Sequence, residues 1–335
     1  MQPTIRDVAR HAETSVSTVS RVLTRQGPVA EATRERIMAA IEALGYQPNA
    51  LARGLVQKRT GAIGVVLPDV TNPFCTEVLR GMGDAASAHG YHLLLVHASL
   101  SFARESEGVQ LLQEKQVDGV IYTSGVVTPR HRELFRRLRR PVALAATWDE
   151  EGGFPGVVVD GRRGASMAME YLAGLGHRRV AVLTGPLEDT VSGQTRWMGY
   201  QEGAERLGIP LRAQWVAHGD YRLESGYRAM TQILRGTDRP SALAAASDMM
   251  AVGAMTAAQD LGLRVPEDLA VVGFDNIWLA AAVRPALTTI AQPLYDMGRK
   301  TVDKLVAVLG GREVTETEWI EPHLVERQST GPARE

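Results

Sequence analysis

The stretch TIRDVARHAETSVSTVSRVL, residues 4–23, predicts the fold of the N-terminal part of the chain. Thr4 can cap a first helix, and Asp7, three residues later, can complete a capping box and favour the positive helix end. Residues 13–15 predict a tight turn, and Ser15 can cap a second helix. Two short helices joined by such a turn form a helix-turn-helix, whose second helix fits the major groove of DNA.

The apolar residues of both helices recur at helical spacing, which assigns an inner and an outer face. The inner positions are Ile5, Val8, Ala9, Ala12, Val19, Val22 and Leu23. Val16, Ser17 and Arg21 then fall on the outer face, where short side chains can approach base edges and an arginine can reach guanine or phosphate. A third helix over 31–44, stopped by Gly45, should cover the other two. A plain three-helix bundle with solvated charges fits the same periodicity.

Charge separates the first 59 residues from the rest of the chain. The 335 residues are enough for two or three domains, and their net charge is −1. Residues 1–59 hold nine Lys/Arg against five Asp/Glu, so the remainder is net acidic. A basic head on an acidic body fits attraction to phosphates, although ordinary scatter of surface charge gives the same counts.

Cysteine use and hydropathy indicate the compartment. The single cysteine, Cys75, excludes an intrachain disulfide framework and suits a reducing environment. No secretory signal is visible, and no apolar stretch approaches twenty residues. We therefore expect a soluble, cytoplasmic protein that makes no membrane contact.

Four motifs together resemble the head and hinge of the lactose/galactose repressor family. They are TIRDVA from residue 4, SVSTVSRVL from residue 15, VAEATRERI from residue 29 and ALGYQPNALARGL from residue 43. The resemblance implies a helix-turn-helix DNA-binding domain over residues 1–45 and a hinge over 46–60. Members of this family are mostly homodimeric or tetrameric transcription regulators that respond to sugars, nucleobases or a partner protein.

The resemblance also assigns DNA contacts residue by residue. Val16, Ser17 and Arg21 occupy the base-reading positions, while Thr4, Arg6, Ser15 and Asn49 fall where phosphate contacts are usual. Leu55 matches a leucine that is wedged into the minor groove, which kinks the duplex. This sequence departs from the family at Glu13, which replaces a frequent glycine, at Thr14, which replaces a common valine, and at Ala30, which replaces a serine cap.

From Gly61 the pattern changes to short apolar runs typical of strands buried on both faces. One series covers 62–67, 92–96, 119–122 and 142–145, and a second covers 157–160, 179–183, 242–246 and 269–274. Helical stretches such as 77–89 and 105–115 lie between them, so we predict two parallel doubly wound α/β sheets. The resemblance implies a two-lobed body like periplasmic binding proteins, with lobes at 61–160 plus 291–320 and 161–290 plus 321–330.

Ligands of such folds bind at the carboxyl ends of strands, so polar residues directly after strands are the candidate effector contacts. These residues are Asp69, Asn72, Phe74, Thr190, Ser192, Arg196, Tyr221, Ser247, Asp275 and Gln292. Arg196 and Asp275 offer fixed donors and acceptors for neighbouring hydroxyls, and an aromatic face can cover a sugar ring. The alternatives are a structural ion pair for Arg196 and Asp275, a packing role for Phe74 and a helix cap for Asn72.

The identity of the effector stays open. Ser247 replaces an asparagine common in sugar responders, and Ala146 and Thr147 stand where sugar binders often place an acid. A carbohydrate-like effector is expected, as a sugar, a sugar acid or a sugar phosphate. A purine between Phe74 and Tyr221 is the other possibility.

The sequence predicts a regulator that carries no cofactor, no metal and no catalytic residues. The dinucleotide, P-loop, zinc-protease and serine-hydrolase motifs are missing, and the histidines lack the spacing of metal ligands. The rival interpretations are an enzyme and a free-standing sugar-binding protein. Residues 249–258 are apolar on more than one helix face, which indicates either a helix buried within the chain or a homodimer contact. The resemblance places dimer contacts there and on the helix at 77–89, so two heads would read a pseudo-palindromic operator.

Overall fold

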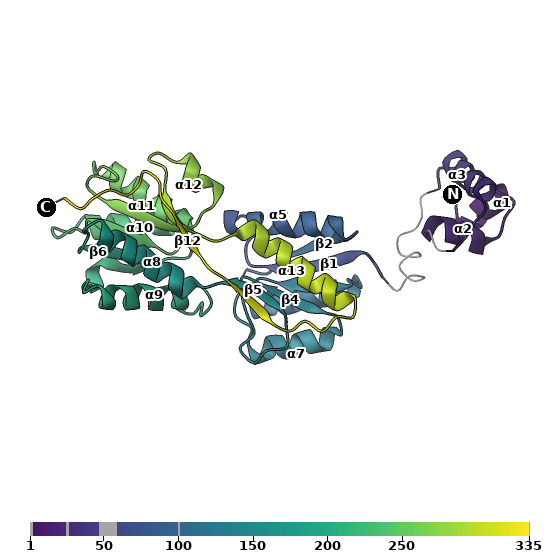
Figure 1. Cartoon of the computed structure of the whole chain (residues 1–335), viewed down its shortest axis with the longest axis horizontal. Coiled ribbons are helices and arrows are strands. Elements are labelled where there is room, and N and C mark those ends of the chain that lie inside the picture. The colour runs from purple at the N-terminus through teal and green to yellow at the C-terminus, as the bar shows by residue number, and fades with distance from the viewer. Residues whose placement is uncertain (1–2, 25–26, 47–58, 100, 335) are drawn as a thin grey trace. The chain divides into compact units, whose positions relative to one another are not determined.

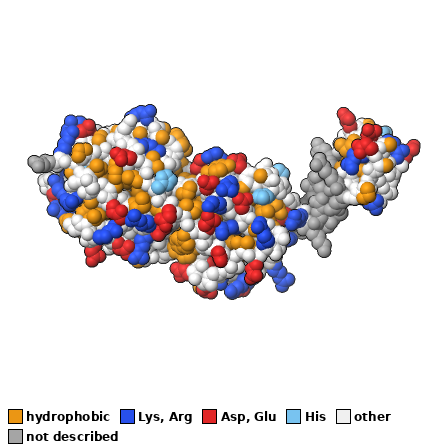
Figure 2. Space-filling model, viewed as in Figure 1, with side chains coloured by type: hydrophobic (Ala, Val, Ile, Leu, Met, Phe, Trp, Pro, Cys, Tyr) orange, Lys and Arg blue, Asp and Glu red, His pale blue; other side chains and the backbone are white. Residues whose placement is uncertain are grey.

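A computed structural model describes residues 3–24, 27–46, 59–99 and 101–334. The described residues up to Ala62 form one compact unit together with residues 116–118, and the other described residues form a second unit with two lobes (Figure 1). Among the described residues, no helix combines the length and the apolar character needed to cross a membrane. Figure 2 shows acidic and basic side chains interspersed over the visible face of the two-lobed body.

The head contains α1 (Ile5–His11), α2 (Val16–Thr24) and α3 (Glu31–Leu44). Its core is formed by Val8, Ala9, Ala12, Val19 and Val22, all at the predicted inner positions of the first two helices, together with Ile37 and Ala40 of α3. The Asp7 carboxylate accepts hydrogen bonds from the Thr4 backbone N–H at 2.9 Å and from the Thr4 hydroxyl at 2.7 Å. Gly45 ends α3 in the left-handed conformation, and Ala30 provides no side-chain cap.

The turn between α1 and α2 contains a strained residue. Glu13 has a φ of 48°, in the left-handed region that glycine adopts without a steric cost. This conformation explains in physical terms why a glycine would suit this position.

Glu13→Gly should therefore stabilise the head by about 0.5–1 kcal/mol, since the relief of steric strain outweighs the extra backbone entropy of the unfolded chain. Hydrogen exchange at the amides of α1 and α2 in the full-length protein measures the change. Glu35→Gly, in the exposed middle of α3, is the control and should destabilise the head by about 1 kcal/mol. Faster exchange in Glu13→Gly than in the wild type would contradict the strain.

Lobe 1 is built on a sheet with the strand order β11-β5-β4-β3-β1-β2. Its strands are β1 (Ala62–Leu67), β2 (His92–His97), β3 (Gly119–Tyr122), β4 (Val142–Ala145), β5 (Gly156–Val159) and β11 (Thr317–Ile320), and its helices are α5 (Pro73–Ala88), α6 (Phe102–Glu114), α7 (Pro129–Leu138) and α13 (Leu294–Leu309). Figure 1 shows α5 and α13 on one side of the sheet and α7 on the other. Because helices cover both faces, β1, β3 and β4 are buried runs without polar alternation.

Lobe 2 is built on a sheet with the strand order β12-β10-β9-β8-β6-β7, in which β12 runs antiparallel to β10. Its strands are β6 (Val180–Thr184), β7 (Val216–His218), β8 (Ala242–Ala245), β9 (Ala270–Asp275), β10 (Thr288–Ala291) and β12 (His323–Val325), and its helices are α8 (Gly161–Gly174), α9 (Gly193–Arg206), the 3₁₀ turn η1 (Ala213–Trp215), α10 (Leu223–Leu234), α11 (Asp248–Asp260) and α12 (Trp278–Ala282). The chain passes between the lobes after β5, after β10 and after β11.

Close helix crossings depend on glycine. A Cβ at Gly81 of α5 would lie 2.0 Å from the Tyr295 carbonyl oxygen of α13, and a Cβ at Gly298 would lie 2.0 Å from the Val78 carbonyl oxygen. The two helices therefore approach closely enough to cover one face of the lobe 1 sheet together.

Two predicted helices begin earlier than their periodicity indicated. The helix expected at 77–89 is α5, which starts at Pro73 because Asn72 caps it and proline suits a first helical position. The helix expected at 105–115 is α6, which starts at Phe102. The apolar faces of α11 are covered within the chain, mainly by α10 and β9, so they do not indicate a subunit interface.

Candidate functional site

The outer face of α2 is the first candidate site. The Ser15 hydroxyl accepts the Thr18 backbone N–H at 3.1 Å, which caps the helix as predicted. Val16, Ser17 and Arg21 are exposed, while Val19 and Val22 on the opposite face are buried. Val16 is 41% exposed although it is apolar, so α2 presents a mixed row of apolar, hydroxyl and guanidinium groups.

The remaining predicted DNA contacts are distributed as follows. Thr4 and Arg6 are exposed at the start of α1, and the Thr4 hydroxyl is bonded to Asp7, which lowers the pKa of that carboxyl. Asn49 and Leu55 lie outside the described residues, so their roles in DNA contact stay predictions.

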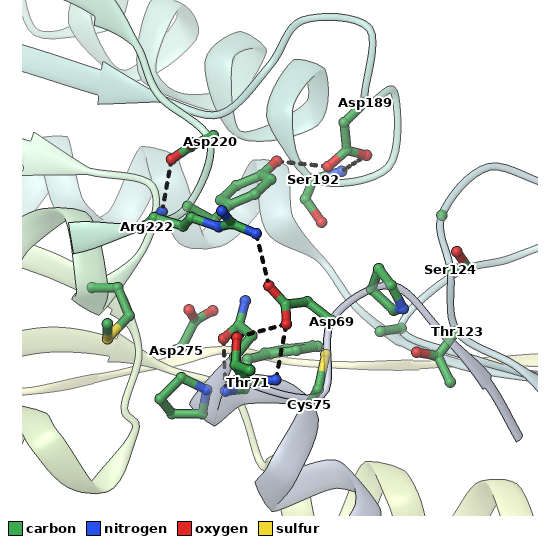
Figure 3. Close-up of a pocket in the computed structure, with 18 of the residues that line it drawn as sticks. Asp69, Thr71, Cys75, Thr123, Ser124, Asp189, Ser192, Asp220, Arg222 and Asp275 are labelled. Carbon is green, nitrogen blue, oxygen red and sulfur yellow. Dashed lines mark hydrogen bonds and ion pairs between the residues drawn. The ribbon is translucent and has the colours of Figure 1, made fainter. Parts of the chain in front are cut away.

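The second candidate site is a cavity of about 760 Å³ between lobes 1 and 2. Of the predicted effector residues, the cavity is lined by Asp69, Asn72, Phe74, Ser192, Arg196, Tyr221 and Asp275. Asp69, Ser192 and Asp275 are labelled in Figure 3. The alternative roles considered for Asn72, as a helix cap, and for Phe74, as a packing residue, are also seen in the structure. Asn72 caps α5 by accepting the Phe74 backbone N–H at 2.9 Å, and Phe74 packs partly against the lobe 1 core.

Arg196 and Asp275 form the most buried charged pair on the cavity wall, with side chains 7% and 8% exposed. Their Nη2 and Oδ1 atoms lie 3.6 Å apart, and the guanidinium stacks 4.0 Å from the centre of the Phe274 ring. Nη1 donates to the Ala246 carbonyl oxygen, while Nε is buried without a hydrogen-bond partner. Phe274 and the Ala246 carbonyl therefore fix the Arg196 side chain in place, and the Arg196–Asp275 pair keeps hydrogen-bonding capacity for a ligand.

A second carboxylate stands behind Asp275. Burial raises the pKa of Asp275 to about 6, although Arg196 and the Gln292 amide, which donates at 2.7 Å, counteract that rise. Burial also raises the pKa of Asp248 well above its ordinary value, and the nearby Asp275 charge adds to the effect. Asp248 accepts the Ile277 backbone N–H at 2.8 Å and the Thr289 hydroxyl at 2.5 Å, so it braces the loop after β9.

Three predicted effector residues do not line the cavity. Ser247 is turned to the start of α11, where its hydroxyl accepts the Met250 backbone N–H at 3.2 Å. Gln292 supports Asp275 from behind, and Thr190 is exposed in the loop after β6. A polar residue after a strand often satisfies the next helix terminus first, which sequence position alone does not reveal.

Several lining residues were not predicted, including Asp189, Asp220 and Arg222. The Tyr221 hydroxyl donates to Asp189 at 2.6 Å, and the other Asp189 oxygen accepts the backbone N–H groups of Val191 and Ser192. Arg222 reaches across the cavity mouth to Asp69 of lobe 1, with 3.2 Å between Nη2 and Oδ2. Asp220 and Arg222 flank the predicted Tyr221, so the rule about strand ends could have included them.

Both the N-terminal head and the two-lobed body match known protein families. Residues 4–49 match the bacterial regulatory proteins of the lacI family, and residues 169–330 match a periplasmic binding protein-like domain. Catabolite control protein A of Priestia megaterium is 38% identical over 332 residues, which cover 98% of this chain and 100% of that protein. The transcriptional repressor PurR of Photorhabdus laumondii subsp. laumondii is 35% identical over 329 residues, covering 97% and 96%.

A solved structure agrees with these relatives along the whole chain. The lac repressor dimer bound to operator and the anti-inducer ONPF superposes with a TM-score of 0.89 at 29% identity. The match covers 99% of this chain and 100% of the other.

Proposed function

Because the chain belongs to the lacI family of bacterial regulatory proteins, and is thus a DNA-binding transcriptional regulator rather than an enzyme, we propose that it is a repressor controlled by a neutral sugar. The sugar binds in the cavity between the lobes and changes the affinity for a pseudo-palindromic operator. The observation that carries this proposal is the buried Arg196–Asp275 pair on the wall of a cavity that also presents aromatic rings.

The composition of the cavity wall supports a neutral effector over a sugar acid or a sugar phosphate. Its charged side chains include the carboxylates of Asp69, Asp189, Asp220, Glu224 and Asp275 against the guanidinium groups of Arg196 and Arg222. Both arginines already pair with a lining carboxylate, so an anionic ligand would meet net negative charge. Hydroxyl groups can donate to carboxylates and accept from guanidinium groups, which suits this wall.

A thermal-shift screen of the full-length protein tests the effector class. Neutral mono- and disaccharides should raise the melting temperature, because a ligand that binds only the folded state stabilises it. Sugar acids, sugar phosphates and purines form the other arms of the screen. A larger shift with any of those arms than with every neutral sugar would overturn the proposed effector.

The exposed row on α2 supports operator binding. Arg21 can reach guanine or phosphate, Ser17 can bond a base edge, and the Val16 methyl groups can contact a thymine methyl. The lac repressor structure shows that protein as a dimer on its operator. We propose the same use of the head here, in the cytoplasm, with residues 1–45 as the DNA-binding domain and 46–60 as the hinge. The lobe boundaries at 160, 290 and 320 belong to the same proposal.

A homodimer would form through lobe 1 at β2 and the neighbouring α5. β2 is the edge strand of its sheet, and Leu94 and Leu95 are 38% and 47% exposed on it. Apolar side chains on an exposed edge strand favour association, and a second copy related by a two-fold axis presents the same face. Met249 and the rest of α11 are not needed for this contact.

Leu94→Lys combined with Leu95→Lys should shift the protein from dimer to monomer in sedimentation. Operator affinity should fall about a hundredfold or more, since the two heads no longer bind as one unit. Leu261→Lys, which changes an exposed leucine on lobe 2, is the matched control and should leave the dimer intact. A double variant that sediments as a dimer would refute this interface.

Effector affinity should fall as the pH drops below about 6. The ionised Asp275 accepts two sugar hydroxyls, and below its pKa each pH unit costs up to about tenfold in affinity. Calorimetric titrations between pH 7.5 and 5 measure the loss, and Asp275→Asn should bind weakly with no such slope. Because the folded pKa lies above the ordinary 3.8, this group destabilises the unliganded protein above about pH 6 and ceases to do so in acid. Loss of binding in acid is therefore not unfolding caused by this group.

Ligand binding would be coupled to the operator through the arrangement of the lobes. The Asp69–Arg222 contact joins the lobes at the cavity mouth, next to the proposed sugar site. A ligand that favours one lobe arrangement can shift operator affinity by a coupling free energy of about 1–3 kcal/mol.

A further inference from the structure

A buried polar cluster lies behind the lobe 1 wall of the cavity, away from Arg196 and Asp275. Ser124 follows β3 and lines the cavity (Figure 3), Glu105 lies on α6, and His131 lies on α7. The three residues are 2%, 3% and 6% exposed. Glu105 and His131 do not line the cavity, so they can act on a ligand only through Ser124.

The donor and acceptor of each hydrogen bond in this cluster can be assigned from one backbone N–H group. The Thr128 N–H donates to His131 Nδ1 at 3.1 Å, and a backbone amide can only donate. Nδ1 therefore carries a lone pair, and the ring hydrogen resides on Nε2. That atom lies 2.7 Å from Glu105 Oε2 and donates to it.

The second oxygen of Glu105 fixes the hydroxyl of Ser124. Ser124 Oγ donates its hydrogen to Glu105 Oε1 at 2.6 Å, and Oε1 is the acceptor of that bond. Burial and the neighbouring Glu105 charge raise the pKa of Tyr122, so its hydroxyl also stays protonated beside this carboxylate. The one hydrogen of the Ser124 hydroxyl is thus committed to Glu105, and only acceptor capacity remains for the cavity.

We propose that Ser124 determines effector specificity as an obligatory hydrogen-bond acceptor, and that Glu105 and His131 are the positioning residues that hold it in this state. The inference rests on the proposed neutral sugar effector and narrows it. The sugar must present a hydroxyl hydrogen to the carboxyl end of β3, so an acceptor-only substituent at that ring position is rejected.

One substitution should change the Ser124 hydroxyl from a hydrogen-bond acceptor toward the cavity into a hydrogen-bond donor. In Glu105→Gln the His131 Nε2–H still donates, because the Thr128 amide keeps the tautomer fixed. The glutamine carbonyl must then face His131, which turns the glutamine NH₂ toward Ser124. Ser124 would accept from that NH₂ and could donate its own hydrogen into the cavity. Glu107→Gln, at an exposed position of the same helix, is the matched control.

The test uses the full-length protein with a neutral sugar that binds it and the complete set of monodeoxyfluoro derivatives of that sugar, measured by calorimetry. Fluorine can accept but not donate, so the wild type and Glu107→Gln should lose about tenfold or more at the ring position that faces Ser124. In Glu105→Gln the affinity lost on fluorination at that ring position should shrink below about threefold, and the losses at the other ring positions should stay unchanged. Ser124→Ala should also lose the discrimination at this position alone.

An unchanged discrimination pattern in both Glu105→Gln and Ser124→Ala would overturn the proposal. ¹⁵N NMR of the histidine side chains in the wild type provides a check that needs no ligand. It should find His131 protonated on Nε2 only, and a proton on Nδ1 at neutral pH would overturn the proposed polarity. Failure of every neutral sugar to bind would instead refute the proposed function, while the His131 tautomer would still decide whether Ser124 is an acceptor.

Discussion

Arg196→Ala should lower the affinity for the sugar effector by at least about a hundredfold and should abolish the effect of that sugar on operator binding. Arg196 supplies donors at the cavity wall and is the charge partner of Asp275, whose side chain is only 8% exposed. Removal of one member of a buried ion pair leaves the other charge uncompensated, which costs about 3–5 kcal/mol. Part of that cost falls on folding, so the melting temperature should also drop.

Arg206→Ala is the control for this variant, because Arg206 lies at the end of the same helix and pairs with Glu170 on the surface. That surface pair should contribute less than about 1 kcal/mol, so effector binding should not change. Isothermal titration gives the affinity, and operator binding with and without sugar gives the coupling. Sugar-dependent operator binding that persists in Arg196→Ala would show that the effector binds elsewhere.

Val16→Glu should lower operator affinity by at least about a hundredfold while the effector affinity stays at the wild-type value. The substitution places a carboxylate at the exposed start of α2, where we propose contact with bases and with the surrounding phosphates. Repulsion between the carboxylate and the phosphates costs several kcal/mol, and a dimer carries the substitution twice.

The matched control is Met38→Glu, which adds the same charge at a 53% exposed position on α3 of the same small domain. This control should weaken binding only slightly, by general repulsion. Fluorescence anisotropy at one fixed salt concentration measures both variants. Equal losses in Val16→Glu and Met38→Glu would mean that α2 does not read the DNA.

Local sequence signals were sufficient for the elements that depend on local chemistry. The Thr4–Asp7 exchange, the Ser15 cap and Gly45 mark helix ends through hydrogen bonds within one turn, so the head could be predicted closely. Buried parallel strands such as β1 are apolar on both faces and were equally visible. The short strands β10 and β12 are recognisable only after the chain has folded back between the lobes.

Features that depend on long-range geometry could not be predicted. Arg222 meets Asp69 across 153 positions of sequence, and the Glu105–His131 contact joins two helices that pack only in the folded lobe. Ser247 lies near the carboxyl end of a strand just as Asp275 does, yet it caps a helix rather than facing the cavity. The apolar α11 could equally have been a subunit contact, because periodicity does not reveal whether the covering surface belongs to the same chain.

Sugar control of operator binding can be measured as the affinity of the full-length protein for an operator selected from random duplex DNA, titrated with the neutral sugar that stabilises the protein most. We expect one dimer on each pseudo-palindromic site and a sugar-dependent change of about 5- to 150-fold in the dissociation constant. Sequence-specific binding that no stabilising sugar alters, or a protein that selects no duplex sequence at all, would contradict this expectation.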